Sequence, residues 1–469
     1  MKRWTKSGTR QKIGAKQDTY LAYRLVIIPE NQQLLHSGVI IEMLSPMKRI
    51  IQLGVLCFLN IYIFGQSTKL DNKNYLKDIK TVILQKNSDL YDPVPIMELG
   101  ASNALRISFD ILSPNNEFFN YSFVHCDKNW KPSDLQYMDY VSGDMMGEIT
   151  DFVFSTNTYQ KYTHYSLVFP QPTMAITKSG NYILKVFRNF DDEDLVLTRR
   201  FMVLDNQTNI TVDLRSATLP EYRFTHQEID FEVNHEGFQI PNPFTELSAT
   251  ILQNNSWNNA IYNLPPLFVN SNKLVFNYED KNLFPGTNEF RFFDIRSLRF
   301  FSNNVIKKYT DSIQNAVLRP EEPRYALKHL NWLDYNGKRV IANSDGVNIV
   351  EDGDYAMIHF YFKSKSLAQL GDVYVYGELT DWQLKDNFKM TYFPDYDMYG
   401  LSTLLKQSYY NYHFVLKDKT GNIDYTLTEG NFQETENDYM ILIYHKNQFY
   451  GYDELIGMVS RNSNVLNNR

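Results

Sequence analysis

The chain has 469 residues, a formal net charge of −7 at pH 7, and 33 Tyr and 31 Phe but 2 Cys. At roughly 100 to 200 residues per domain, this length predicts two to four domains, and we expect three. Abundant aromatic residues favour pleated, half-buried strands over helices, so we expect a mainly β protein. An acidic chain repels phosphate backbones, which argues against nucleic acid as a partner.

The N-terminal region has the layout of an export signal. A basic start at Met47, an apolar run and the small residue Gly65 before Gln66 are typical of a secretory signal peptide, predicted at 47–66. Because such signals lie at the N-terminus, residues 1–46 are expected to be a mis-annotated extension, with the mature chain starting near Gln66. A membrane anchor with a cytoplasmic extension is the alternative.

Export would leave an acidic chain with one thiol. Residues 1–66 carry nine Lys or Arg and three Asp or Glu, so their removal changes the net charge from −7 to −13. No later segment has 18 uninterrupted apolar residues, and we therefore expect a chain that does not itself span the membrane. Cys57 leaves with the signal, and Cys126 alone cannot form an intramolecular disulfide.

The segment 67–206 is predicted to form a first antiparallel β-sandwich of the immunoglobulin type. Leu105, Ile107, Phe109 and Ile111 alternate with polar residues, which places them on one face of a strand. The expected strands are 105–112, 120–126, 162–169, 180–188 and 195–204, with turns at 113–116 and 189–194.

Two further β units are expected, a second sandwich at 207–320 and a third, early-set-like unit at 321–469 with a frayed C-terminus. Two prolines among charges at 318–324 predict a stiff, exposed linker between them. In the second unit we expect strands at 227–234, 247–253, 273–278 and 287–294, and loops at 235–244 and 254–266. In the third we expect strands at 355–362, 373–376, 410–416 and 438–444.

His125, Cys126 and Asp127 are adjacent, which raises the question of a nucleophile with its base. A thiolate nucleophile needs a base within hydrogen-bond reach. Successive side chains of a strand point to opposite faces, so His125 and Cys126 diverge. A His–Asp pair with a distant serine stays open, although no Gly-x-Ser-x-Gly elbow accompanies it. A strand end without chemistry is the favoured interpretation.

Metal binding has weak support. Zinc would need three or four ligands at workable spacing, and near Cys126 the sequence offers His164 but no second thiol. The acidic run 191–194 lacks the spaced oxygen ligands of a calcium loop and is predicted to be a solvated turn. We expect no metal and no cofactor.

The residues after Asp127 favour a shaped loop. Pro132 blocks ladder pairing, while Ser133 and Asp134 can accept hydrogen bonds from backbone amides and fix a turn. Trp130 is then expected to cover the edge of the domain. The value of this stretch would be its surface geometry, either for packing or for a partner.

The segment 373–382 resembles the strand, turn and Trp of early-set domains appended to glycogen-handling enzymes. In those domains exposed aromatic rings stack on sugar faces. Trp382 with Tyr392 or Tyr399 would form such a platform, but aromatic residues in sandwiches more often belong to the core. Sugar binding stays open as an alternative.

A set of motifs, in order along the chain, resembles the plug proteins of the type IX secretion system. The similarity spans roughly Asp78 to Met458. It is carried by His125-Cys126-Asp127-x-x-Trp130-x-Pro132-Ser133-Asp134, Tyr162-Thr-His-Tyr165, Ser179-Gly-Asn-Tyr182, Arg199-Arg-Phe-Met-Val203, Asn288-Glu289-Phe-Arg291, Phe293-Asp-Ile-Arg296, Gly377-Glu-Leu-Thr-Asp-Trp382, Glu434-Thr-Glu-Asn-Asp-Tyr439 and Tyr452-Asp-x-Leu-Ile-Gly457.

The resemblance implies a non-enzymatic periplasmic protein, peripheral to the inner face of the outer membrane. Such a protein binds the periplasmic opening of a large outer-membrane β-barrel translocon and seals it when no cargo is engaged. Because interfaces favour Trp, Tyr and Arg anchors, Trp130, Tyr137 and Tyr140 are candidate contacts. The alternatives are a carbohydrate-binding accessory protein of the cell envelope that uses Trp382, and an enzyme that uses Cys126.

Overall fold

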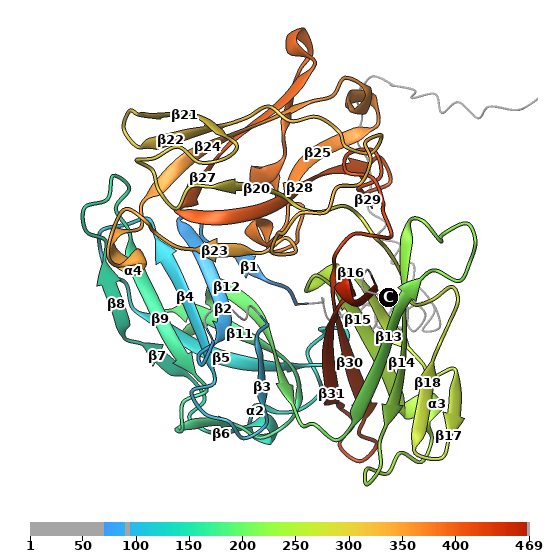
Figure 1. The fold of residues 1–469 in the computed structure, drawn as a ribbon. Helices are drawn as coiled ribbons and strands as arrows, with labels where there is room; N and C mark the ends of the chain where they lie inside the picture. The colour runs from blue at the N-terminus through green and yellow to red at the C-terminus, as the bar shows by residue number, and fades with distance from the viewer. Residues whose placement is uncertain (1–69, 90–93, 467–469) are drawn as a thin grey trace, which may run out of the picture. The chain divides into compact units, whose positions relative to one another are not determined.

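The computed structural model describes residues 70–89 and 94–466. The predicted extension at 1–46, the predicted signal peptide at 47–66 and the first residues of the predicted mature chain lie outside these residues. The described chain is mainly β, built almost entirely from antiparallel sheets, which confirms the predicted class (Figure 1). None of its helices has the length and hydropathy that a membrane crossing requires.

The first sandwich packs two sheets around one core. Leu105, Ile107, Phe109 and Ile111 all face this core, as their alternation predicts. One sheet has the order β1 (Lys73–Asn74), β12 (Asp191–Leu204), β11 (Gly180–Arg188), β5 (Phe119–Cys126) and β7 (Gly147–Ile149), with β3 (Ile96–Glu98) parallel to β12. The other has the order β2 (Ile79–Lys86), β4 (Leu105–Ile111), β9 (Thr163–Phe169) and β8 (Asp151–Phe154).

The second sandwich is completed by the end of the chain. Its first sheet contains β13 (Asn209–Ser216), β14 (His226–Asn234), β18 (Lys273–Phe276) and β17 (Phe268–Asn270), with β19 (Leu283–Pro285) beside β14. Its second sheet has the order β16 (Ser256–Leu264), β15 (Leu247–Gln253), β30 (Asp438–Lys446) and β31 (Asp453–Asn462). Figure 1 shows the dark red β30 and β31 beside the green strands.

The third sandwich is formed by the chain between β19 and β30. One sheet joins β20 (Arg291–Asp294), β28 (Ser408–Asp418) and β23 (Arg339–Ile341), and β25 (Gly371–Tyr376) and β29 (Ile423–Asp424) also pair with β28. The other has the order β21 (Val305–Thr310), β22 (Gln314–Leu318), β24 (Tyr355–Lys363), β27 (Met398–Lys406) and β26 (Thr391–Phe393). Short elements elsewhere are α2 (Tyr137–Tyr140), β6 (Val141–Gly143), β10 (Met174–Ile176), α3 (Pro243–Glu246) and α4 (Ile349–Asp352).

Strand pairing therefore crosses the boundary that we predicted at 320. Ile441 and Ile443 of β30 lie in the core of the second sandwich, opposite β15, although the sequence suggested that they belong to the third. Conversely β20 and β22 contribute Phe293 and Ala316 to the core of the third. Period-2 patterning identifies a strand but carries no information about its partner, so the insertion was not visible in the sequence.

Three local predictions differ from the structure. The expected loop at 254–266 is strand β16, because Asn254 and Asn255 both adopt positive φ and close a tight hairpin with β15. The expected exposed linker at 318–324 is held to the third sandwich, where Glu321 bridges to Phe362. The chain beyond 458 continues as β31 to Asn462 instead of fraying.

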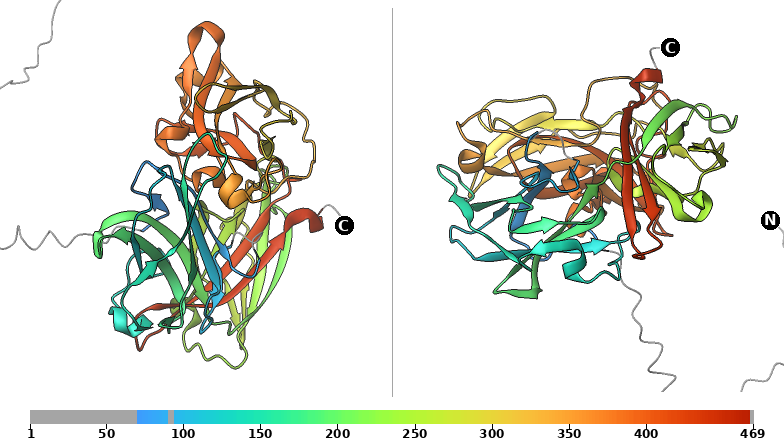
Figure 2. Two further views of the ribbon diagram at one scale, coloured as in Figure 1. Left: turned by 90° about the vertical axis from the view of Figure 1, so that its left-hand side faces the viewer. Right: turned by 90° about the horizontal axis from the view of Figure 1, so that it is seen from below.

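The first and second sandwiches pack through the outer faces of their sheets. Ile183 of β11 points away from the first core, which receives its neighbours Tyr182 and Leu184. It joins an interface cluster with Trp130 and, from the second sandwich, Leu442. Because both of its faces are covered, β11 is buried along nearly its whole length. Figure 2 shows the strands of both sandwiches from two further directions.

Candidate functional site

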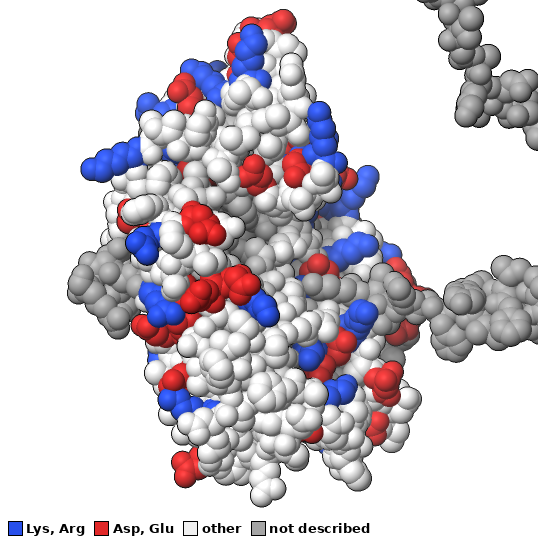
Figure 3. Space-filling view, turned by 90° about the vertical axis from the view of Figure 1, so that its right-hand side faces the viewer, with Lys and Arg blue, Asp and Glu red and all other residues white. Residues whose placement is uncertain are grey.

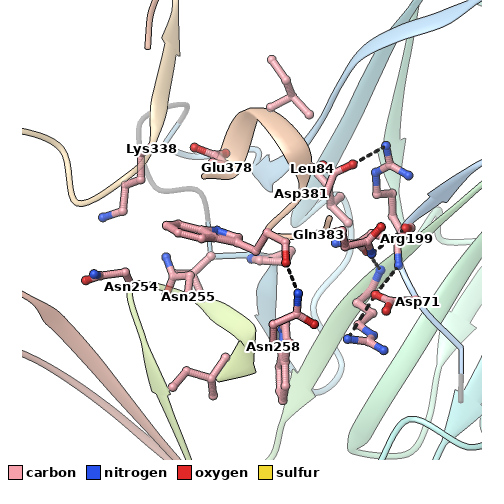
Figure 4. A pocket seen from close by; sticks show the side chains of 18 of the residues that line it. Asp71, Leu84, Arg199, Asn254, Asn255, Asn258, Lys338, Glu378, Asp381 and Gln383 are labelled. Carbon is pink, nitrogen blue, oxygen red and sulfur yellow. Dashed lines mark hydrogen bonds and ion pairs between the residues drawn. The ribbon is translucent and has the colours of Figure 1, made fainter. Parts of the chain in front are cut away.

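A small cavity of about 110 Å³ with a mixed polar and apolar lining lies where residues of all three sandwiches meet (Figure 4). It is the region in which several of the quoted motifs come together. The first sandwich contributes Asn72 and Arg199, the second contributes Asn258, and the third contributes Asp381 and residues around it. The cavity therefore lies at a junction between the three sandwiches.

The third sandwich reaches this junction through the turn at 377–382. Gly377 starts the short 3-10 helix η2 (Glu378–Thr380) at φ 155°, and Asp381 and Trp382 follow in the left-handed region at φ 54° and 57°. This backbone turns the carbonyl of Trp382 toward the second sandwich, where the side-chain amide of Asn258 donates to it. The next residue, Gln383, donates through Nε2 to the carbonyl oxygen of Asn72, 2.9 Å away.

Trp382 is packed within this junction. Its ring lies edge-on to Tyr376 at 5.7 Å and to Phe290 at 6.0 Å between centroids. Tyr392 and Tyr399 instead pack on each other at 4.9 Å, and Tyr399 is buried. The predicted sugar platform is therefore not assembled in this structure, because Trp382 contacts different aromatic residues from those contacted by the two tyrosines.

Charge at the junction is balanced by a buried carboxylate. Asp381 lies 2.5 Å from Nζ of Lys385 and 3.7 Å from Nη2 of Arg199, an ion pair marked in Figure 4. Burial alone would raise the pKa of Asp381, but Lys385, Arg199 and Arg339 outweigh it and hold this pKa well below its usual range. The carboxylate is thus ionised and joins the third sandwich to the first.

The His125–Asp134 stretch forms a turn at the end of β5. Oδ1 of Asp127 accepts from the backbone N–H groups of Asn129 at 2.9 Å and Lys131 at 2.8 Å. Trp130 sits at φ 66°, a conformation that this hydrogen-bonded turn imposes. Pro132 forms an isolated bridge with Cys126 and closes the loop.

His125 is a buried, neutral histidine. Nε2 lies 3.2 Å from the carbonyl oxygen of Ser179 and must donate to it, so Nδ1 accepts from the hydroxyl of Ser133 at 2.8 Å. Burial lowers the pKa of His125 to about 4, against small opposing effects of Ser179 and Asp453. Both ring nitrogens are occupied, and the side chain has no free position for a base.

Cys126 is equally enclosed. Its side chain is buried in the interface cluster, and burial, reinforced by Asp127, raises the pKa of the thiol to about 12. A thiol in this state is protonated near neutral pH and is a poor nucleophile. His125 points instead to Ser133 and Ser179, so the pair does not form the Cys–His geometry of a hydrolase.

Two of the three candidate contact aromatics lie inside the molecule. Trp130 is fully buried, edge-on to Trp257 of the second sandwich at 4.8 Å, with the guanidinium of Arg200 4.6 Å from its ring. Tyr140 is buried and donates to the carbonyl oxygen of Phe123. Trp130 was expected at an edge, but the second sandwich covers it, and Tyr137 alone of the three keeps partial exposure.

The predicted motif residues Asn288, Glu289 and Arg291 also build a buried network. Nε of Arg291 contacts the carboxylate of Glu429 at 2.9 Å, and its Nη1 pairs with Glu321. Asn288 donates to the carbonyl oxygen of Glu429 at 2.9 Å, and Oε1 of Glu289 accepts from the N–H of Glu436. Burial is opposed by Arg291 and Arg324, which hold the pKa of Glu429 well below its usual range.

One buried ion pair was missed by sequence reasoning. Nζ of Lys406, in β27, lies 2.7 Å from Oδ2 of Asp110, in β4, and the two side chains are 2% and 1% exposed. Oδ1 of Asp110 contacts Nδ1 of His164 at 2.6 Å, and the hydroxyl of Tyr355 donates to Oδ2 at 2.7 Å. Asp110 follows Phe109 and points to the opposite face of the strand. The alternation therefore predicted that its side chain faces solvent, and it gave no sign that the third sandwich covers this face.

No metal centre emerges at the positions that we considered. His164 pairs with Asp110, and the expected acidic turn at 191–194 is the beginning of strand β12, where Asp192 and Asp194 pair with Lys185 and Arg188. Within residues 70–89 and 94–466, no group of three or more His, Cys, Asp or Glu side chains is arranged to hold a metal ion.

Comparison with known proteins identifies the first domain. Residues 79–205 match the family model described as type 9 secretion system plug protein 1st domain. This match supports the type IX secretion system plug family, and it assigns residues 79–205 to the first domain of such a protein. In the crystal structure of a hypothetical protein from Parabacteroides merdae, a chain that is 28% identical superposes with a TM-score of 0.81, covering 84% of this chain and 100% of that one. No curated protein matches.

The location of the motifs gives their conspicuous residue types a structural role. The His125–Trp130 turn joins the first sandwich to the second, and Lys128 donates through Nζ to Ser248 at 2.9 Å. The turn at 377–382 joins the third sandwich to both others. Their polar and aromatic groups make contacts between the sandwiches.

Proposed function

We propose that this plug-family chain, a component of type IX secretion, binds the periplasmic opening of the outer-membrane translocon and closes it when no cargo is engaged. A stopper must keep its form under contact with a pore and needs no reaction centre. Buried junctions between the three sandwiches, and the enclosure of His125 and Cys126, support a binding role. The family match supports the partner.

The observation that carries the proposal is an apolar segment at 325–335 that points outward. Each of Tyr325, Leu327, Leu330, Leu333 and Tyr335 is more than half exposed, and Leu333 reaches 87%. The segment contains no strand or helix. Large apolar side chains gathered in this way on a soluble surface are typical of a partner site.

The polar groups of the same segment point inward. Trp332 donates through Nε1 to the carbonyl oxygen of Phe290 at 3.0 Å. Asp334 accepts from the N–H of Phe290 at 2.5 Å, and just before the segment Arg324 pairs with Glu429 at 2.6 Å. Its form is thus fixed before any partner binds, which lowers the entropy lost on association.

The partner surface that fits this segment is apolar. Lys328 is its one exposed charged residue, because His329 is turned toward Glu289 and Asp334 is half-buried. An aromatic or aliphatic surface at the mouth of the translocon would bury the leucines without leaving a charge unpaired. Figure 3 shows charged and uncharged surface on one face of the molecule.

Affinity isolation tests the proposal. A tagged chain from residue 67 should recover the translocon barrel from the outer membrane in mild detergent, at near-equal amounts. Replacing Leu327, Leu330 and Leu333 together by Ser should abolish recovery while leaving the melting temperature unchanged. A matched variant with Ser at the exposed residues Phe118, Phe190 and Phe268 should retain it.

Two results would count against the proposal. Recovery of the chain without a barrel would remove the partner. Equal recovery by both triple variants would move the contact elsewhere, and Tyr137→Ala would then be the next variant. Closure itself is tested separately: cells without this chain should admit a large dye that the wild-type chain excludes.

A further inference from the structure

A basic crevice lies between the first and third sandwiches. It has a volume of about 660 Å³ and lies between the β1–β2 edge and the residues that follow η2. Its lining contains seven cationic side chains and two carboxylates, in a chain whose net charge is −7. The cations are Lys73, Lys77, Lys80, Arg199, Arg339, Lys385 and Lys406, and the carboxylates are Asp381 and Asp386.

Part of this charge is compensated within the fold. Arg199 and Lys385 share Asp381, and Lys406 pairs with Asp110. The charge of Arg339 interacts with the carboxyl groups of Glu378 and Asp381. These contacts account for the four cations on the inner wall.

Three lysines of one short stretch are left without such compensation. Among the described residues, Lys73, Lys77 and Lys80 have no carboxylate within ion-pair distance, although Asp78 lies near Lys80 and acts on it at longer range. Lys80 is half-buried. Burial and the neighbouring charge of Lys385 lower the pKa of Lys80, against Asp78, so the fold holds a lysine where its charge is unfavourable.

A second observation concerns Arg339. Its Nη2 donates to the carbonyl oxygen of Val82 at 2.6 Å, but its Nε is buried and has no hydrogen-bond partner among the described residues. An unused guanidinium donor beside the half-buried Lys80 and two exposed lysines is a preformed arrangement for a multivalent oxyanion. Apolar side chains, including Leu76, Leu379 and Phe388, line the same crevice.

We propose that this crevice binds a ligand that carries a phosphate group, held by Lys80 and its neighbouring lysines with Arg339 at its inner end. Lysine ammonium groups act as point charges toward phosphate, and a guanidinium adds directed donors. The apolar wall leaves room for a carbon moiety beside the phosphate. The phosphate belongs either to a small soluble compound or to a phospholipid headgroup, and the test separates these sources.

The full chain from residue 67 is titrated with inorganic pyrophosphate by calorimetry at constant ionic strength, and is also floated with vesicles of phosphatidylglycerol or phosphatidylcholine. We expect one saturable pyrophosphate site that Lys80→Gln weakens by about tenfold, corresponding to about 1.4 kcal/mol. The control Lys365→Gln removes a lysine that has an 80% exposed side chain and does not line the crevice, and it should bind pyrophosphate as the wild-type chain does.

Each outcome supports or overturns the proposal of a phosphate ligand. Pyrophosphate binding lost in Lys80→Gln alone supports a soluble phosphate ligand. Flotation with phosphatidylglycerol alone, lost in the same variant, supports a headgroup. Absence of both, or equal weakening by Lys80→Gln and Lys365→Gln, overturns the proposal. Lys80→Gln should melt at or above the wild-type temperature, because it removes a half-buried charge, so misfolding cannot explain lost binding.

Discussion

Replacing Lys406 by Met should be among the most destabilising single changes in this protein. Lys406 and Asp110 are almost fully enclosed, and their Nζ–Oδ2 distance is 2.7 Å. Removing one partner of a buried pair leaves the other charge uncompensated, which typically costs 3–5 kcal/mol. Asp110 would keep its contacts with His164 and Tyr355, so we expect a loss of free energy of unfolding near the lower limit, about 3 kcal/mol.

The pH dependence of the free energy of unfolding should have opposite signs in the wild-type protein and in Lys406→Met. In the wild-type protein Lys406 and His164 outweigh burial and lower the pKa of Asp110. A lowered carboxyl pKa stabilises the fold above the unfolded value of 3.8, and this contribution is lost as the pH falls through the folded pKa. Without Lys406, burial dominates and raises that pKa, so the variant should lose stability as the pH rises above about 4.

Urea unfolding between about pH 2 and 8 measures both pH dependences and the loss of stability. The matched control is Lys389→Met, which breaks an exposed pair with Asp372 at the same 2.7 Å distance and should leave the midpoint unchanged. Adding Asp110→Asn to Lys406→Met should recover part of the loss, because it removes the unpaired charge. A midpoint for Lys406→Met equal to that of the control, with an unaltered pH profile, would refute this reasoning.

Four further outcomes are expected. Trp130→Ala should cost about 3–5 kcal/mol in urea unfolding, since the ring fills the contact between two sandwiches. Cys126 should resist iodoacetamide at pH 8 in the folded chain and react in urea, because burial raises its pKa to about 12. Folded His125 has a pKa of about 4, below its usual 6.5, so the free energy of unfolding should fall as the pH drops from 6.5 toward 4. Measured relative to the value at neutral pH, this fall should be smaller in His125→Gln. Gly180→Ala should lower the melting temperature, because Gly180 has φ 133° and a Cβ there would lie 2.7 Å from Nε2 of His125.

Much of the strand content could be predicted, because alternation reports which face of a strand is apolar. The predicted strand at 180–188 matches β11 residue for residue, and that at 247–253 matches β15. The β16 hairpin was missed because Asn254 and Asn255 were interpreted as loop residues, whereas their positive φ makes the turn that pairs two strands. Local chemistry indicated a turn without indicating that strand continued beyond it.

The candidate site was predicted in composition and missed in location. His125, Trp130 and Trp382 were identified by type and order. Their contacts come from distant parts of the chain: Trp382 meets Asn258, 124 residues away, and Trp130 meets Trp257, 127 residues away. Burial of Trp130 depends on Trp257, and no periodicity of one strand predicts what covers its outer face.

By itself the sequence determined the mainly β class, most strands of the first core and the order of motifs that resembles the plug family, because these follow from alternation and residue identity. Tertiary structure decided that the chain end returns to the second sandwich, that Asp110 and Lys406 meet, and that Trp130 is interior. These outcomes depend on which sheet faces pack together, and that choice is made by shape and buried area summed over the whole molecule.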